Sequence, residues 1–145
     1  MADLESLKRQ FLEHLEIERG RSLKTVENYD HYLSRFLDYA KTKSPKGISD
    51  ELIREYRLWL NRQSAGGKGE TLKKKTQNYY LIALRAFLKY LRKRGVDSLS
   101  PERIELAKVS ARDLDLITEA ELNRLMKAPE GDELKALRDR AMLEL

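Results

Sequence analysis

The stretch TLKKKTQNYYLIALRAFLKYLRKRG, residues 71–95, joins a long apolar stripe to a dense set of positive charges. Its apolar residues recur every three or four positions, which is the spacing of one face of an α-helix. The set expected to be buried is Tyr80, Ala83, Leu84, Phe87, Leu88 and Leu91. The polar stripe on the other side is Lys74, Asn78, Arg85, Lys89 and Arg92. We therefore predict a helix over about residues 71–94 with one face in a core.

This helix also carries the chain's excess of positive charge. Between residues 68 and 95, nine basic residues stand against one acid, Glu70, giving a local charge of +8 that exceeds the +5 of the whole chain. A basic stretch of helix length is the electrostatic footprint of a protein that binds nucleic acid. The expected partner is therefore polyanionic.

The remaining sequence repeats the helical spacing, and no run alternates with period two over a useful length. We predict helices over about residues 4–19 and 22–41, a third opened by Ser49, and two more over 118–128 and 132–145. Ser22 and Ser49 are expected N-caps, Gly20 a helix stop, and Thr118 with Glu121 a capping box. The predicted fold class is all-α: two packed helical hairpins, then a linker and one or two further helices.

A weak internal repeat supports the two hairpins. Residues 24–39 aligned with 75–90 match at seven of sixteen positions. The repeat predicts that each hairpin presents a Lys-Thr pair at the start of its second helix. The alternative, that amphipathic helices of similar composition align by chance, remains open.

Catalytic and metal sites find little support in the sequence. The chain of 145 residues has no cysteine, and its two histidines, His14 and His31, fall on different predicted helices without acidic partners at metal-ligand spacing. The glycine-rich run at residues 66–69 follows a helix and lacks P-loop spacing. We expect no catalytic residue, no metal and no cofactor. No apolar run is long enough to span a bilayer, so cytoplasmic location is the default expectation.

Anion binding is better supported, at two helix starts. Lys73, Lys74, Lys75 and Thr76 occupy the expected first turn of the fourth helix, and Ser22, Lys24 and Thr25 repeat this arrangement in the second. Free backbone N–H groups and the positive end of the helix dipole favour phosphates there. Asn28 and Asn78 follow one turn later, where an amide can contact adenine in a major groove, although both can equally be plain exposed residues. Tyr79 can stack on a base or lie at the edge of the core.

Four segments in order carry a family resemblance: SLKTVENY at 22–29, LIALRAFLKYL at 81–91, LITEAEL at 116–122 and LRDRAML at 137–143. The first two resemble the core-binding domain of tyrosine recombinases, the phage integrase and Xer-like family. The last two resemble the first elements of that family's catalytic domain. The loop after the third helix is more glycine-rich than in relatives, and Ser100-Pro101 stands where relatives often have Asn-Pro.

The resemblance implies a domain plan. Residues 1–95 would be a SAM-like core-binding domain of four helices, 96–117 an interdomain linker, and 118–145 a truncated start of the catalytic domain. In the family, the helical domain is one half of a clamp around duplex DNA. The family's catalytic residues, including its tyrosine nucleophile, come after the point where this chain ends. We therefore expect the chain to bind DNA without cleaving it.

The partner implied is double-stranded DNA, bound by a chain that is a monomer alone and assembles with other protomers on DNA in the full-length protein. The residues expected to bind DNA are Ser22, Lys24, Thr25, Asn28, Lys73, Lys74, Lys75, Thr76, Asn78, Tyr79, Arg85 and Arg92. An alternative of a different class is a helical adaptor or RNA-binding protein whose basic helix binds an acidic partner.

Overall fold

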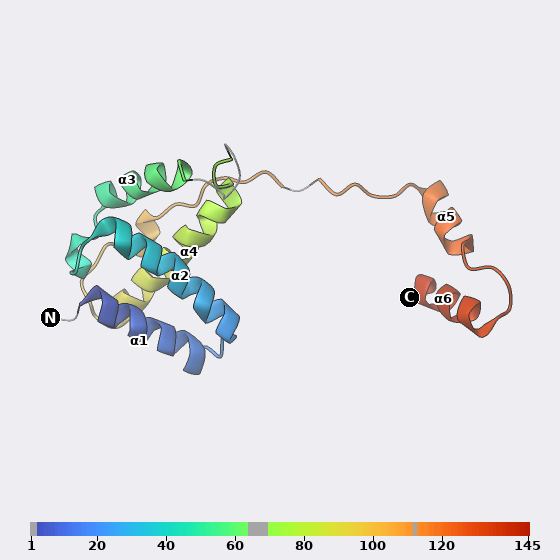
Figure 1. Ribbon diagram of the computed structural model, residues 1–145, viewed down its shortest axis with the longest axis horizontal. Helices are drawn as coiled ribbons and strands as arrows, with labels where there is room; N and C mark the ends of the chain where they lie inside the picture. The colour runs from blue at the N-terminus through green and yellow to red at the C-terminus, as the bar shows by residue number, and fades with distance from the viewer. Residues whose placement is uncertain (1–2, 64–69, 112) are drawn as a thin grey trace. The chain divides into compact units, whose positions relative to one another are not determined.

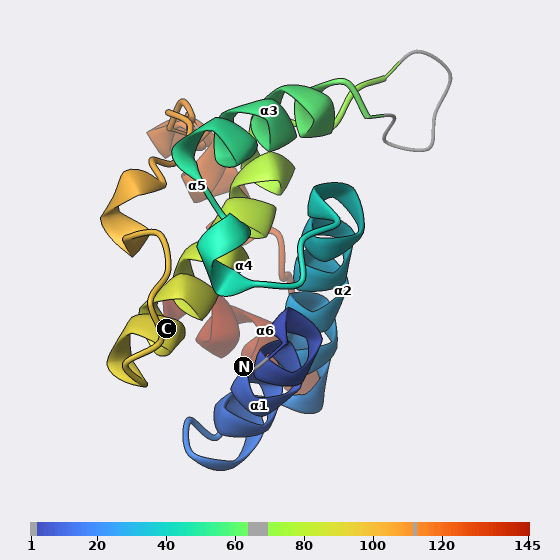
Figure 2. The same ribbon diagram turned by 90° about the vertical axis from the view of Figure 1, so that its left-hand side faces the viewer.

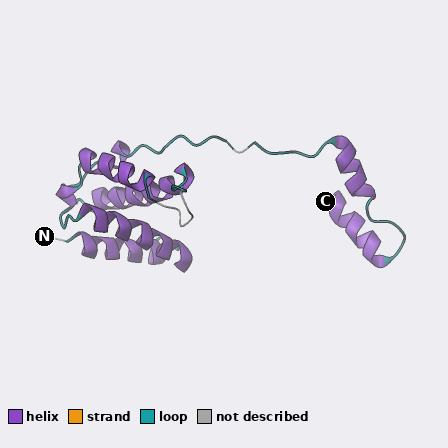
Figure 3. Ribbon diagram, turned by 45° about the horizontal axis from the view of Figure 1, so that its top comes forward, coloured by secondary structure: helices purple, strands orange, loops and turns teal. Residues whose placement is uncertain are grey.

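The computed structural model describes residues 3–63, 70–111 and 113–145. In that part the chain forms six α-helices and two short 3₁₀ helices, which confirms the all-α prediction (Figure 1; Figure 3). The chain divides into two compact units, Met1–Val109 and Ser110–Leu145. The predicted glycine-rich loop at residues 64–69 lies outside the described residues.

Helices α1 (Leu4–Ile17) and α2 (Leu23–Ala40) form the first hairpin and lie side by side (Figure 2). At the turn, Gly20 has a φ of +58°, which glycine adopts without the steric cost of a Cβ atom. Ser22 begins α2 as its N-cap, and its Oγ accepts a hydrogen bond from the backbone N–H of Thr25 at 3.2 Å. The buried residues of the hairpin are Leu4, Leu7, Phe11, Leu15, Leu33, Phe36 and Leu37.

Helices α3 (Asp50–Asn61) and α4 (Lys74–Lys93) form the second hairpin, after the short η1 (Pro45–Gly47). The Ser49 hydroxyl accepts from the backbone N–H of Leu52 at 3.2 Å, as its predicted capping role requires. Helix α4 packs against α1, α2 and α3, so its apolar stripe forms the centre of the core. It starts at Lys74 rather than near residue 71 because the backbone N–H of Leu72 donates to the carbonyl of Gln63, two residues after the end of α3.

Residues 96–109, which we call the strap, belong to the first unit. They contain η2 (Pro101–Arg103), and Ile104 is buried with 1% of its surface exposed. Val96, Leu99 and Leu106 also pack against the core. The sequence prediction ended the helical domain at residue 95 and began a linker there. The structure differs because these apolar side chains extend the core beyond the end of α4.

The second unit contains α5 (Glu119–Lys127) and α6 (Leu134–Glu144). Thr118 and Glu121 form the predicted capping box: Thr118 Oγ1 accepts from the Glu121 N–H at 3.2 Å, and Glu121 Oε2 accepts from the Thr118 N–H at 2.7 Å. Neither helix has a buried residue among those the structure describes. In its described residues, the second unit therefore has secondary structure without a core of its own.

Candidate nucleic-acid interface

The start of α2 presents small hydroxyls and a cation to solvent. The hydroxyls of Ser22, the N-cap residue, and Thr25, in the first turn, lie 2.9 Å apart. Lys24 pairs with Glu27 at 3.3 Å, but its side chain is 78% exposed, so the pair contributes little to stability and leaves the ammonium group available to an anion. Asn28, one turn further along, is also exposed.

The start of α4 is more strongly positive. Lys73 is the N-cap residue, and Lys73, Lys74 and Lys75 are all exposed, while Thr76 is half-buried. In the described part of the chain, no side chain caps this helix start, and its first turn contains no acid. Three cations at the positive end of a helix dipole repel it, and a bound polyanion would relieve that repulsion.

Both helix starts lie on the same side of the first unit, at its right-hand edge in Figure 1. The internal repeat predicted this correspondence in part: Lys24-Thr25 and Lys75-Thr76 are each the second and third residues of their helices. Two helix starts that contain exposed lysines and free backbone N–H groups thus lie on one side of the unit. This arrangement suits a ligand with several phosphates better than a single small anion.

Further along the two helices, α2 and α4 meet through an aromatic cluster. Tyr80 of α4 accepts a hydrogen bond from Arg35 Nη1 at 3.0 Å, and His31 Nε2 lies 3.2 Å from the same hydroxyl. The Arg35 guanidinium also lies over the rings of Trp59 and Tyr80, at 5.3 and 5.4 Å from their centroids. Tyr79, which precedes Tyr80 in the chain, keeps 44% of its surface exposed.

Arg35 was not among the predicted site residues. Helical spacing puts Arg35 on the same face of α2 as Lys24 and Asn28, and this is the only signal for it in the sequence. The structure adds that its side chain is held in place by two rings and a hydroxyl. A cation fixed in this way loses less rotational freedom on binding than a free lysine does.

Three of the predicted residues contact the strap, although Arg92 remains exposed to solvent and Arg85 is half-buried. Asn78 is buried and forms two hydrogen bonds with the backbone of Ala107. Arg85 Nη1 donates to the Ile104 carbonyl at 3.3 Å, and Arg92 Nη1 lies 3.1 Å from Glu102 Oε2. The predicted groove-facing role of Asn78 does not agree with this arrangement, because both functional atoms of its amide already have partners.

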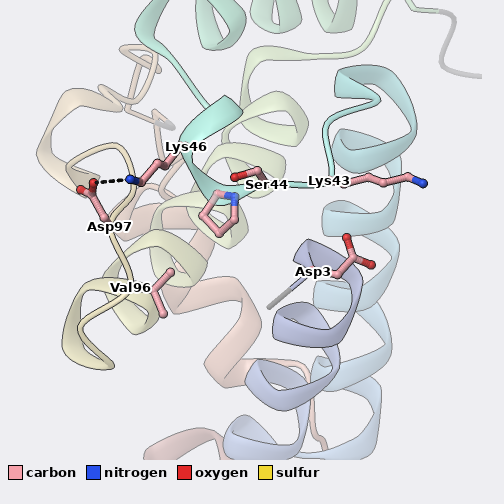
Figure 4. A pocket seen from close by; sticks show the side chains of 7 residues that line it. Asp3, Lys43, Ser44, Lys46, Val96 and Asp97 are labelled. Carbon is pink, nitrogen blue, oxygen red and sulfur yellow. Dashed lines mark ion pairs between the residues drawn. The ribbon is translucent and has the colours of Figure 1, made fainter. Parts of the chain in front are cut away.

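A pocket lies away from the starts of α2 and α4. It is formed where the start of α1, η1 and the first residues of the strap meet (Figure 4). Its lining residues are Asp3, Lys43, Ser44, Pro45, Lys46, Val96 and Asp97. Lys46 and Asp97 form an ion pair at 3.7 Å, and their side chains are 69% and 83% exposed. This combination of an exposed ion pair and small apolar surfaces makes a surface hollow and offers no constellation for catalysis.

Among the described residues, no group of three or more His, Cys, Asp or Glu side chains is arranged to hold a metal ion. None of the helices in the part of the chain that the structure describes has both the length and the apolar character that a bilayer crossing requires.

Comparison with known proteins gives consistent matches. The family model described as "Phage integrase, N-terminal SAM-like domain" matches residues 9–95. Tyrosine recombinase XerD of Halalkalibacterium halodurans is 30% identical over 141 residues, which cover 94% of this chain and 45% of that protein. Tyrosine recombinase XerC of Thermodesulfovibrio yellowstonii is 30% identical over 136 residues, covering 93% and 42%. For XerC of Bacillus subtilis the identity is 25% over 146 residues, covering 100% and 47%.

The chain thus spans less than half the length of these curated relatives. No solved structure matches the chain significantly.

Proposed function

Because the chain belongs to the phage integrase family of tyrosine recombinases, we propose that it is the part of a site-specific recombinase that binds duplex DNA, as one half of a clamp around the recombination site. The chain itself binds without cleaving. The whole protein breaks and rejoins DNA strands through a covalent phosphotyrosyl intermediate, in the cytoplasm, and assembles with further protomers on DNA. In this proposal the first unit holds the DNA and residues 118–145 begin the catalytic half.

The observation that carries the proposal is the common direction of the two positive helix starts. The starts of α2 and α4 lie on one side of the first unit (Figure 1), and they contain Lys24 with Thr25 and Lys75 with Thr76 respectively. Lysine side chains and helix N–H groups bind the phosphate backbone, which supplies most of the affinity of a protein for DNA. Asn28, Tyr79 and Arg35 lie on the same helices and are the candidates for contacts with bases.

The experiment is a fluorescence anisotropy titration of a labelled random duplex with this chain at several salt concentrations. Binding should weaken steeply with salt, because each neutralised phosphate contributes about 0.9 to the slope of log K against log salt. A variant with Lys73, Lys74 and Lys75 all changed to Ala should lose about three units of that slope.

The same titration with single-stranded RNA and with an acidic peptide tests the alternative class. Stronger binding to the duplex than to both competitors supports the clamp proposal. Absence of duplex binding even at low salt would overturn it and favour a helical adaptor. Equal binding to all three ligands would also count against the clamp proposal, since a positively charged surface without preference for duplex DNA would then explain the binding.

A further inference from the structure

The strap runs along α4 in the opposite direction to the helix. Near the end of α4, Arg92 contacts Ser100 and Glu102. In the middle of the helix, Arg85 contacts Ile104. Near its start, Asn78 contacts Ala107. The order of these contacts brings the chain from the end of α4 back to its beginning. The strap therefore leaves the first unit beside the basic helix start.

The contact at Asn78 is the most specific of these. Its Nδ2 donates to the Ala107 carbonyl and its Oδ1 accepts from the Ala107 N–H, both at 2.9 Å. The side chain is 9% exposed. An asparagine amide carries a donor and an acceptor in fixed geometry, so it pairs with one residue's backbone as a neighbouring strand would. This contact fixes both the position and the orientation of Ala107.

The residue after Ala107 is Lys108, whose side chain is exposed. On α4, Lys74 lies four residues before Asn78, and residues four apart share one face of a helix. The Asn78–Ala107 contact therefore holds Lys108 next to the face that carries Lys74. Cations brought together in this way repel one another, and the fold tolerates that cost where a polyanion compensates it.

We propose that Asn78 is a positioning residue: by holding Ala107 against α4 it adds Lys108 to the cations of the DNA-binding surface. The same contact makes the connection to the second unit free to move only beyond about Val109. The part concerning Lys108 rests on the proposed function, and the part concerning the point of attachment does not. The two parts are tested separately.

Hydrogen exchange of the complete chain, measured by NMR without DNA, tests the attachment. In the wild-type protein the amide of Ala107 should exchange at least about tenfold more slowly than that of Ser110, because a hydrogen-bonded anchor must open first. Asn78→Ala should remove this protection. Asn78→Asp keeps the acceptor for the Ala107 N–H and loses the donor to its carbonyl, so its protection should be intermediate.

Asn28→Ala is the matched control, since it removes an exposed asparagine amide from α2 and should leave Ala107 unchanged. Amides in the middle of α4 report whether each variant remains folded. Unprotected Ala107 in the wild type would overturn the proposal, as would protection that survives Asn78→Ala. Loss of protection throughout α4 in both Asn78 variants would also contradict it, because Asn78 would then support the core rather than the strap.

DNA binding tests the role of Lys108. Lys108→Ala should lower the salt slope by about one unit in the wild-type background. In the Asn78→Ala background, where the strap is released, the same change should have a clearly smaller effect. Equal effects in both backgrounds would show that Asn78 does not position Lys108. A chain that binds no DNA fails the proposed function, while the exchange experiment still decides the attachment.

Discussion

Lys75, in the first turn of α4, is an exposed cation. If it contacts a phosphate, Lys75→Ala should weaken binding to all duplex sequences by a similar factor and lower the salt slope by about one unit. Anisotropy titrations of two unrelated duplexes at four or more salt concentrations measure both effects.

Lys46→Ala is the control for that variant. It also removes one exposed lysine, and so changes the net charge equally, but Lys46 lines the pocket of Figure 4, away from the helix starts. Its salt slope should remain that of the wild type. Equal losses for Lys46→Ala and Lys75→Ala would mean that overall charge, rather than the start of α4, determines binding.

Glu102, in the strap, offers a test by pH. A hydrogen bond from the Ser100 hydroxyl is the largest cause that holds the pKa of the Glu102 carboxyl below its usual range, and the charge of Arg92 contributes less. A carboxyl whose pKa is lowered in the folded state adds stability above its usual pKa, and that stability is lost as the pH falls through the lowered value.

In an NMR titration of the carboxyl, the midpoint should therefore lie below that of an unfolded glutamate. Ser100→Ala should raise this midpoint further towards that of an unfolded glutamate than Arg92→Ala does. The reverse order would show that the ion pair, and not the hydroxyl, is the main contact of Glu102.

At the scale of the elements, α4 carries the core of the first unit. Phe87 is completely buried, and the centroid of its ring lies 5.5 Å from the ring centroid of Phe11 in α1. Phe87→Ala should lower the free energy of unfolding by about 3–5 kcal/mol, from lost burial and the cavity left behind. Urea unfolding followed by the fluorescence of Trp59, the single tryptophan, measures this loss.

Leu58→Ala in α3 gives the comparison, since 48% of the Leu58 surface is exposed. Its effect should stay within about 0.5 kcal/mol. A loss for Phe87→Ala below about 1 kcal/mol would mean that α4 is not the central helix of the core.

The helices were predictable from sequence because their signals are local. Apolar residues three and four apart gave the buried faces, and Ser22, Ser49 and Thr118 gave the helix starts, each with the capping bond seen in the structure. The start of α4 was predicted about three residues too early. No local signal marks the contact between Leu72 and Gln63 that keeps the preceding residues outside the helix.

The strap was missed because its contacts are not local. Its apolar residues follow no period, and Asn78 and Arg85 bind the backbone of Ala107 and Ile104. A backbone carbonyl is present at every residue, so the sequence does not reveal which one a side chain will reach. The same limit explains why the candidate site could be predicted only in part. Its cations could be read from the sequence, but the exposure of Lys75 and the burial of Asn78 depend on where the strap lies.

At the scale of the whole molecule, the two units differ in how they are stabilised. The first buries apolar side chains from four helices and the strap. In the second, most apolar side chains of the described helices are exposed, including Leu134 at 85% and Met142 at 62%. Most helical stability in proteins comes from the packing of an apolar face, and isolated helices of 9 and 11 residues are marginal in water.

Hydrogen exchange should therefore divide the chain at about Val109. Amides in the middle of α4 should exchange only through global unfolding of the first unit, while those of α5 and α6 should exchange orders of magnitude faster, through local opening. Because self-association could cover the exposed leucines, the exchange is measured at two protein concentrations at least tenfold apart and should not change between them. Protection of α6 equal to that of α4 at both concentrations would contradict this expectation, because the last helix would then be packed within the chain itself. Such packing agrees with the adaptor alternative. It does not agree with a DNA-binding unit that is followed by the beginning of a second domain.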